Sequence, residues 1–390
     1  MVVALLSVLL QGQAALTLPD AWDAALRGRG VARSAAAGVA AASGSLRLAG
    51  QVANPSLLLS STGAAPRAHL ILDQPLSWLA TRGSDRSAAR AALEGAQADS
   101  TATIAQLGAE VHRAFYALLA RDARRRLLGE QQAVADSLER IARRRYEAGD
   151  ISQFELEQVE LESRLQGQLL AAEDVEVDVA RAQLARVIGW PESRVPPLAG
   201  SLDDGLANAA GPDSAQEIPM VLVAKADSSQ WASSLQSVRQ SRIPIPSLQV
   251  GIEWNDSTEP GQTFAVLGVF IPVPIWNQGG AQVAEAQARA DASAAAVIEA
   301  RLAARQRLEE ARLRLAGTAA RAVAARDSLV PAAARLRGRA LAAYRAGETG
   351  LVPVLEAVRR ERDIQLSEVD DLVAFQDAVA ALHELLGEAP

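Results

Sequence analysis

Two long stretches of strong helix formers constrain the fold of this chain more than any other sequence feature. They cover about residues 85–147 and 280–346, and the second has no proline before Pro331. About 65 helical residues would extend roughly 100 Å, at 1.5 Å per residue. A helix of that length has no globular core of its own, so it must pack lengthwise on other helices. The sequence therefore predicts bundles of long helices.

Composition supports this prediction and excludes several functions. Aromatic residues make up only 4% of the chain, although apolar residues make up 49%. A compact globule of 390 residues usually fills its core with more large aromatic side chains. The formal net charge of −7 is mild and does not indicate a nucleic-acid-binding protein. The chain has no cysteine, which excludes disulfides, thiolate metal sites and a lipid-modified N-terminal cysteine.

The N-terminal residues resemble an export signal. An apolar run from Val2 to Leu10 is followed by small and polar residues. The run is too short to span a bilayer as a helix, and we predict a signal peptide over residues 1–15. No other stretch is a plausible transmembrane helix, so the chain would enter a membrane only by strands.

The sequence contains an internal repeat. The segments RRRYEAGDIS (143–152) and LAAYRAGETG (341–350) share a Tyr-x-Ala-Gly-acid phrase at an offset of 198 residues. Other matching positions recur at offsets of 191 and 197, and the difference fits an insertion in the loop around 255–262. We predict a first structural repeat over 16–195, a loop-rich linker over 196–214 and a second repeat over 215–390.

Each repeat has the same order of elements. Two extended segments come first, at 56–64 and 69–78 in one repeat and at 247–255 and 263–274 in the other; the segment 247–255 alternates apolar and polar residues as a strand does. A helical hairpin follows, at 85–189 with its tip at 146–151 and at 280–387 with its tip at 344–350. The helices after the tips are expected at 152–189 and 351–387. A shorter helix is expected at 215–242.

The repeated phrase marks the tips of the hairpins. Gly149 and Gly347 fit the left-handed position just after a helix C-terminus. Ser152 and Glu155 form an S-x-x-E capping box for the next helix, whereas the second copy has Gly350 as N-cap and Pro353 in the first turn. Pro331 should bend or restart the second long helix, while the first repeat has Ala133 at the matching position.

Several motifs resemble one protein family. They include LTLPDAWDAAL (16–26), NPSL (54–57), DQPL (73–76), RYEAGDIS (145–152), IPIPSLQVG (243–251), IPVPIWNQGGAQVAEA (271–286) and YRAGE (344–348). In this order and spacing, the chain resembles the outer-membrane efflux protein family of TolC-type exit ducts. The IPVPIWNQG stretch is most similar to the branch that serves heavy-metal efflux pumps of the cobalt–zinc–cadmium type.

The resemblance implies a mainly α fold with a small β part. Long helical hairpins would form a periplasmic tube, and four strands per chain would contribute to a trimeric 12-stranded membrane β-barrel. Four strands are too few to close a barrel alone, which agrees with a homotrimer. Trp78, Trp254 and Trp276 lie at strand ends, where an interfacial aromatic girdle would place them. The implied location is the outer membrane of a Gram-negative-type bacterium.

The resemblance also implies partners and a gate. The family's tip docks a periplasmic adaptor, or membrane fusion protein, which connects to an inner-membrane transporter such as an RND pump. Glu356 matches one of the family's acidic gate positions, and Pro353 stands where the other would be. The candidate adaptor contacts are Arg145, Tyr146, Gly149, Asp150, Tyr344, Gly347 and Glu348.

No motif for chemistry is present. His69, His112 and His383 are too scattered for zinc spacing, and the sequence lacks the nucleotide and nucleophile motifs of common enzymes. We therefore expect no enzyme activity, no cofactor and no metal site. The alternatives are a periplasmic adaptor, which has one hairpin rather than two, and a structural coiled-coil protein without a barrel. The cargo, whether metal ions or other small toxic molecules, is left open by the sequence.

Overall fold

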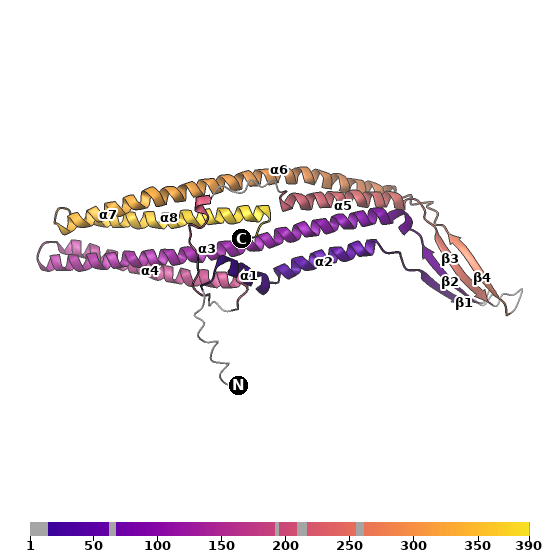
Figure 1. Cartoon of the computed structure of the whole chain (residues 1–390), viewed down its shortest axis with the longest axis horizontal. Coiled ribbons are helices and arrows are strands. Elements are labelled where there is room, and N and C mark those ends of the chain that lie inside the picture. Colours follow the sequence, from indigo (N-terminus) through magenta and orange to yellow (C-terminus); the bar gives the residue numbers. More distant parts are fainter. Residues whose placement is uncertain (1–14, 62–67, 192–194, 209–216, 255–260, 390) are drawn as a thin grey trace, which may run out of the picture. The chain divides into compact units, whose positions relative to one another are not determined.

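The computed structural model describes residues 15–61, 68–191, 195–208, 217–254 and 261–389 (Figure 1). These residues form two compact units that do not coincide with the two sequence repeats. The tip unit contains the described residues of Met1–Arg33, Ala102–Gln216 and Gln306–Pro390, and the sheet unit contains those of Ser34–Thr101 and Glu217–Arg305. The predicted signal peptide, apart from Ala15, and parts of the predicted loops lie outside the described residues.

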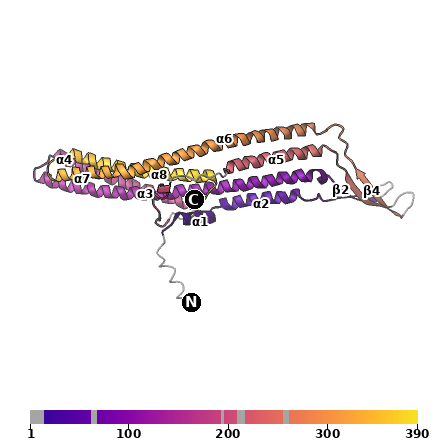
Figure 2. The ribbon, with the colours of Figure 1, turned by 45° about the horizontal axis from the view of Figure 1, so that its top comes forward.

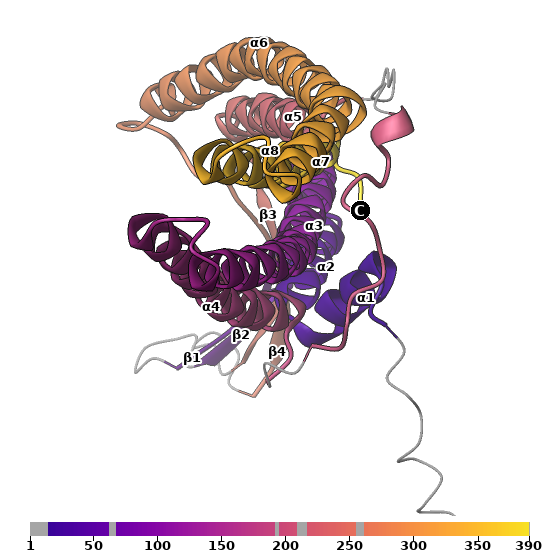
Figure 3. The ribbon, with the colours of Figure 1, turned by 90° about the vertical axis from the view of Figure 1, so that its left-hand side faces the viewer.

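The tip unit is built mainly from two helical hairpins. α3 (Trp78–Glu147) and α4 (Gln153–Ile188) form the first, and α7 (Val330–Arg345) and α8 (Leu351–Leu386) form the second. Figure 3, which looks at the tips, shows the two hairpins next to each other. The shorter α1 (Leu18–Gly28) packs against α4, and η1 (Leu206–Asn208) is a single 3₁₀ turn.

The sheet unit contains one antiparallel sheet in the order β1-β2-β3-β4. Its strands are β1 (Ser56–Ser61), β2 (Ala68–Pro75), β3 (Ser247–Trp254) and β4 (Thr263–Phe270). Four helical segments lie side by side in the order of the strands to which they connect: α2 (Val31–Ala49), the first part of α3, α5 (Pro219–Ser241) and the first part of α6 (Gly280–Ala324) (Figure 2). Within the described residues, β1 and β4 each have one neighbour, so both edges of the sheet are free.

Glycine permits the close pairing of β2 with β3. A Cβ atom at Gly251 would lie 2.4 Å from the carbonyl oxygen of Leu70 on the neighbouring strand. No side chain fits there without a shift of the backbone, so the register depends on this glycine.

Three apolar clusters hold the tip unit together. The largest joins α1, α3 and α4 around Phe115, Leu184 and Ile188. A second lies close to the tips and contains Tyr344, Leu351 and Val354 from the second hairpin with Leu138, Ala142 and Val159 from the first. The third joins α6 and α8 around Phe375 and Leu382. Packing between helices therefore replaces the single core of a globular domain.

A polar joint ties the linker to both hairpins. The side-chain nitrogen of Gln376 in α8 donates hydrogen bonds to the carbonyl oxygens of Leu202 and Asp204, each at 2.9 Å. The Gln376 oxygen lies 3.0 Å from Nε2 of His112 in α3. His112 is buried and packs against the ring of Tyr116, with 4.6 Å between ring centroids. One glutamine thus connects the two repeats and the segment between them.

The predicted elements are present, but several bounds differ. β2 and β4 end earlier than predicted, at Pro75 and Phe270. Proline has no N–H to donate to a ladder; Pro75 is the last residue of β2, and Pro272 and Pro274 follow β4. α3 starts at Trp78 rather than at residue 85, and α5 covers Pro219–Ser241 within the predicted 215–242. α1 and α2 were not predicted. α2 has no buried residue.

Pro331 interrupts the second long helix, as predicted. A π-helical turn, η2 (Ala325–Leu329), separates α6 from α7, and Pro331 lies in the first turn of α7. Proline has no N–H to donate and crowds the preceding turn of a helix, so the chain accommodates it through an i→i−5 bond from Val330 to Ala325. α3 passes through Ala133 without interruption. The two hairpins therefore differ in helical regularity.

Candidate functional site

At the first tip, α3 is followed by a glycine whose backbone has the left-handed conformation. Gly149 has φ of 80°, and the amide of Asp150 donates to the Arg145 carbonyl at 2.8 Å. Ser152 and Glu155 form the predicted capping box, in which each side chain accepts from the backbone N–H of the other residue. The tip is therefore a tight, well-capped turn, as the repeated phrase predicts.

The second tip has the same turn with weaker capping. Gly347 has φ of 79°, and the Glu348 amide donates to the Ala343 carbonyl at 2.9 Å. Gly350 is the N-cap of α8, as predicted, and it supplies no side-chain hydrogen bond. The start of α8 thus lacks the reciprocal bonds that hold the start of α4.

The two tyrosines of the repeated phrase occupy opposite environments. Tyr344 is 2% exposed and belongs to the apolar cluster near the tips, whereas Tyr146 is 41% exposed. Arg145 lies over the Tyr344 ring, with 4.9 Å from its guanidinium carbon to the ring centroid, and its Nη1 donates to the Tyr344 carbonyl at 3.4 Å. This contact keeps the ends of α3 and α7 level with each other. Among the candidate adaptor contacts, the structure thus leaves Tyr146 accessible and buries Tyr344.

Glu356, the candidate gate residue, is exposed and lines an open groove on the second hairpin. The groove has a volume of about 520 Å³, and Glu356 shares it with Arg339, Arg360 and Leu336. Pro353 lines the same groove, one turn before Glu356. Glu356 is therefore accessible to solvent within a single chain, and its role in a gate stays a prediction.

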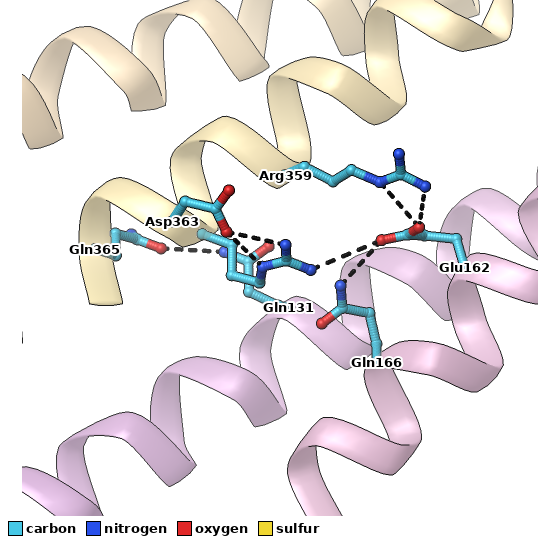
Figure 4. A network of polar contacts seen from close by, with 7 residues as sticks. Gln131, Glu162, Gln166, Arg359, Asp363 and Gln365 are labelled. Atoms are coloured by element: carbon cyan, nitrogen blue, oxygen red, sulfur yellow. Dashed lines mark hydrogen bonds and ion pairs between the residues drawn. The ribbon is translucent and has the colours of Figure 1, made fainter. Parts of the chain in front are cut away.

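A buried polar layer behind the tips was not predicted from the sequence. Glu162 of α4 accepts hydrogen bonds from the Nε atom of Arg359 at 3.0 Å and from Gln166 at 3.0 Å (Figure 4). Arg362 lies 3.8 Å from the same carboxylate, and Gln131 donates to Gln365 at 3.1 Å. This layer joins α3 and α4 to α8 by polar contacts, in contrast to the apolar cluster nearer the tips.

Charge explains how Glu162 stays ionised in that layer. Burial alone would raise the pKa of Glu162, but hydrogen bonds from Arg359 and Gln166 and the charges of Arg359 and Arg362 hold the pKa below its ordinary value. The sequence carried a signal for this layer, because Glu162 and Gln166 stand one turn apart and therefore on the same face of α4.

The strands of the sheet unit expose an apolar face. Leu248, Val250 and Ile252 are exposed on the same face of β3, which agrees with the predicted alternation. Trp276 is 92% exposed, Trp254 ends β3, and Trp78 starts α3 with Arg82 over its ring at 5.9 Å. Their role as membrane-interface aromatics remains a prediction.

The described residues offer no metal centre, since no group of three or more His, Cys, Asp or Glu side chains is placed to hold an ion. His112 is engaged with Gln376, and His69 lies in β2. The same residues contain no helix that is long and apolar enough to cross a membrane.

Comparisons with known proteins give one consistent result. Residues 213–388 match the family model described as outer membrane efflux protein. The cobalt-zinc-cadmium resistance protein CzcC of Cupriavidus metallidurans is 24% identical over 351 residues, which cover 88% of this chain and 83% of that protein.

Solved structures share the fold. A crystal structure of CusC has a TM-score of 0.79 at 17% identity and covers 95% of this chain and 92% of its own. The outer membrane protein VceC of Vibrio cholerae has a TM-score of 0.76 at 17% identity, with 95% and 96% covered. The mainly α architecture with four antiparallel strands is thus the fold of these proteins, as predicted.

Proposed function

The predicted resemblance to the outer-membrane efflux protein family, including its heavy-metal branch, is confirmed, and on that premise we propose that this chain is one third of an outer-membrane exit duct. Three copies would supply twelve strands to one barrel in the outer membrane, and their helices would line a periplasmic tube. The duct would carry metal ions or small toxic molecules passively, without catalysis.

The sheet with two free edges and an exposed apolar face carries this proposal. Strand edges left open in lipid leave backbone N–H and C=O groups without partners, at a cost of several kcal/mol each. β1 of one copy can satisfy β4 of the next, because these are the edges that the sheet leaves free. A structural coiled-coil protein has no need of such a sheet.

In this proposal, the duct works as part of a tripartite pump. An inner-membrane transporter such as an RND pump would supply the energy, and a periplasmic adaptor would contact the tips. The exposed Tyr146 and the tip residues Asp150 and Glu348 are accessible for that contact. Three Glu356 carboxylates around the axis would favour cations over anions.

A cross-linking experiment tests the proposed assembly. The chain has no cysteine, so any disulfide must come from an introduced pair. We would place one cysteine at Ser60 in β1 and the second in turn at each position of β4. Oxidation of the purified protein in mild detergent should give covalent trimers for the positions in register. Monomers at every position, together with no ion conduction in planar bilayers, would contradict the proposal.

The cargo is tested in cells. The name of the Cupriavidus relative favours metal ions for this chain. Deletion of the gene should therefore lower tolerance to zinc, cobalt or copper more than tolerance to a set of drugs. Complementation with the intact gene is the control, and the reverse order of sensitivities would assign the duct to drugs.

A further inference from the structure

The strand register divides the sheet into two faces of different chemistry. Residues directly opposite each other in an antiparallel pair lie on the same face of the sheet, and the face alternates along each strand. One face carries a row of exposed apolar residues, one from each strand: Leu57, Leu72, Val250 and Leu267. In the proposed barrel this face contacts lipid, so the opposite face lines the lumen.

The lumen face carries an imidazole and a carboxylate next to each other. His69 of β2 is directly opposite Glu253 of β3 in the register. Residues paired in this way have Cβ atoms about 4.5–5.5 Å apart. Ser60 of β1 is opposite His69 on its other side, and Phe264 of β4 is opposite Glu253. The side chains of His69 and Glu253 can therefore both reach one small ion between β2 and β3.

Neither of these two side chains is engaged elsewhere. Within the described residues, no hydrogen bond or ion pair involves the His69 ring or the Glu253 carboxylate. The other carboxylate on this face differs, because Asp73 accepts a hydrogen bond from the Ser247 hydroxyl at 2.6 Å. His69 and Glu253 thus present electron-pair donors that remain available to a ligand.

Gly251 holds the two donors in register. It lies two residues before Glu253, and a Cβ atom there would lie 2.4 Å from the Leu70 carbonyl oxygen of β2. A slip of one residue would turn Glu253 to the lipid face and apolar side chains to the lumen. The backbone therefore sets the distance between His69 and Glu253, and a ligand need only select their rotamers.

The chemistry of the pair favours transition-metal ions. Zn²⁺ and ions like it accept imidazole nitrogen together with carboxylate oxygen, whereas Mg²⁺ and Ca²⁺ prefer oxygen ligands alone. Two protein ligands are fewer than a stable metal centre uses, so water would fill the other coordination positions and binding would be weak. Weak binding suits a conduit, because an ion must leave as readily as it enters.

We propose that His69 and Glu253 form a transit site for divalent transition-metal cations in the lumen of the barrel. The pair lies near the ends of β2 and β3 that are farthest from α3 and α5 (Figure 1). In the proposed orientation this is the outer end of the duct, and a trimer has three such sites. The inference rests on the proposed function and deepens it by assigning the cargo class to named residues.

Chemical modification of histidine tests the site. Diethyl pyrocarbonate acylates an accessible imidazole nitrogen only while its electron pair is free, and mass spectrometry locates the product. With the purified full chain in mild detergent at pH 7, Zn²⁺ should lower the modification rate of His69 at least about fivefold. Mg²⁺ at the same concentration should not change it. His383, in the other compact unit, is the internal control and should react equally with either ion.

Two substitutions test the carboxylate. Glu253→Gln keeps the size of the side chain but removes its charge, and should raise the Zn²⁺ concentration for half-protection of His69 at least about tenfold. Asp73→Asn is the matched control, because it removes a carboxylate from the same face at a position that is not opposite His69. It should change that concentration less than about twofold. Equal effects of the two variants, or equal protection by Mg²⁺, would overturn the site.

A gain of binding keeps the test informative if Glu253→Gln disturbs the sheet. Ser60→Cys places a thiolate, a strong zinc ligand, opposite His69 on its other side. Under reducing conditions it should lower the Zn²⁺ concentration for half-protection at least about tenfold. Weaker protection than in the unsubstituted chain would contradict a metal ion at His69.

The sheet-edge cross-linking of the previous section separates this inference from the proposed duct. Covalent trimers without protection of His69 by Zn²⁺ would overturn the transit site and leave the duct intact. Protection of His69 with monomers at every β4 position would support metal binding by the pair and contradict the duct.

Discussion

The two hairpin tips share a sequence phrase but not an environment. Tyr146 of the first is exposed, while Tyr344 of the second is buried beneath Arg145. The first tip has a capping box and an uninterrupted α3; the second has a glycine cap and a π-helical turn before Pro331. A local phrase thus sets the turn, whereas neighbours from the other repeat decide which side chains are buried.

The largest expected difference in stability is between alanine substitutions of the two tyrosines. Tyr344→Ala removes a fully buried ring and should lower the local stability of the second tip by about 3–5 kcal/mol. Tyr146→Ala should change it by less than about 1 kcal/mol, because that ring is largely in solvent. Amide hydrogen exchange around residues 335–358 measures both. Tyr344→Phe is the control. The Tyr344 hydroxyl is buried and has no hydrogen-bond partner among the described residues, so its loss should be neutral or stabilising.

Exchange of proline between the hairpins should have the next largest effect. Ala133→Pro places proline inside the unbroken α3 and should cost about 3 kcal/mol or more. Pro331→Ala should change stability little, since the surrounding turn already lacks regular bonding. Thermal unfolding followed by circular dichroism compares the two variants. Equal losses would mean that the hairpins tolerate interruption alike.

Glu162, which links the hairpins, should show a pH-dependent effect. Its pKa lies below the ordinary value of 4.5, so its ionised form contributes stability above about pH 4.5 that is lost as pH falls through the lowered pKa. Glu162→Gln removes the carboxylate that Arg359 bonds and leaves Arg362 with Asp363 alone, so it should cost about 2 kcal/mol at pH 7. The cost should shrink in acid. Urea unfolding at pH 7 and pH 4 provides the measurement, and a constant difference between the proteins would refute this role.

The smallest expected effect concerns the caps. Ser152→Ala removes the side-chain cap of α4 and should cost about 1 kcal/mol. Gly350→Ser offers α8 a cap that it lacks, and should be neutral or stabilise the second tip by a few tenths of a kcal/mol. Hydrogen exchange of the first turn of each helix reports the change. Opposite signs at the two tips would confirm the difference in capping.

The features that could be predicted from the sequence are those that depend on neighbouring residues. The left-handed glycines, the capping box, the strand pairs and the break at Pro331 depend on residues that are close in the sequence, and the structure contains each of them. α1 has a capping box between Thr17 and Asp20 that could have marked its start. The predicted roles of the tryptophans, of Glu356 and of the adaptor contacts remain predictions.

The unpredicted features depend on residues far apart in the chain. Tyr344 is buried because Leu138, Ala142 and Val159 of the other repeat surround it. Glu162 is tolerated because Arg359 and Arg362 arrive from α8, almost 200 residues later. The sequence pattern of one helix does not predict which distant helix will supply such partners.

The polar joint at Gln376 also fixes where a proton resides. Both linker carbonyls take the amide N–H groups of Gln376, so its oxygen must accept, and the neutral ring of His112 carries hydrogen on Nε2. Its Nδ1 then carries no hydrogen; it is buried, and no group in the part of the chain that the structure describes forms a hydrogen bond with it. Burial lowers the pKa of His112 to about 4 from 6.5, with smaller contributions from His383 and Arg113. In the unfolded chain this histidine takes up a proton below about pH 6.5, whereas in the folded chain it stays neutral to about pH 4. Acid should therefore destabilise the polar joint that links the two sequence repeats at Gln376.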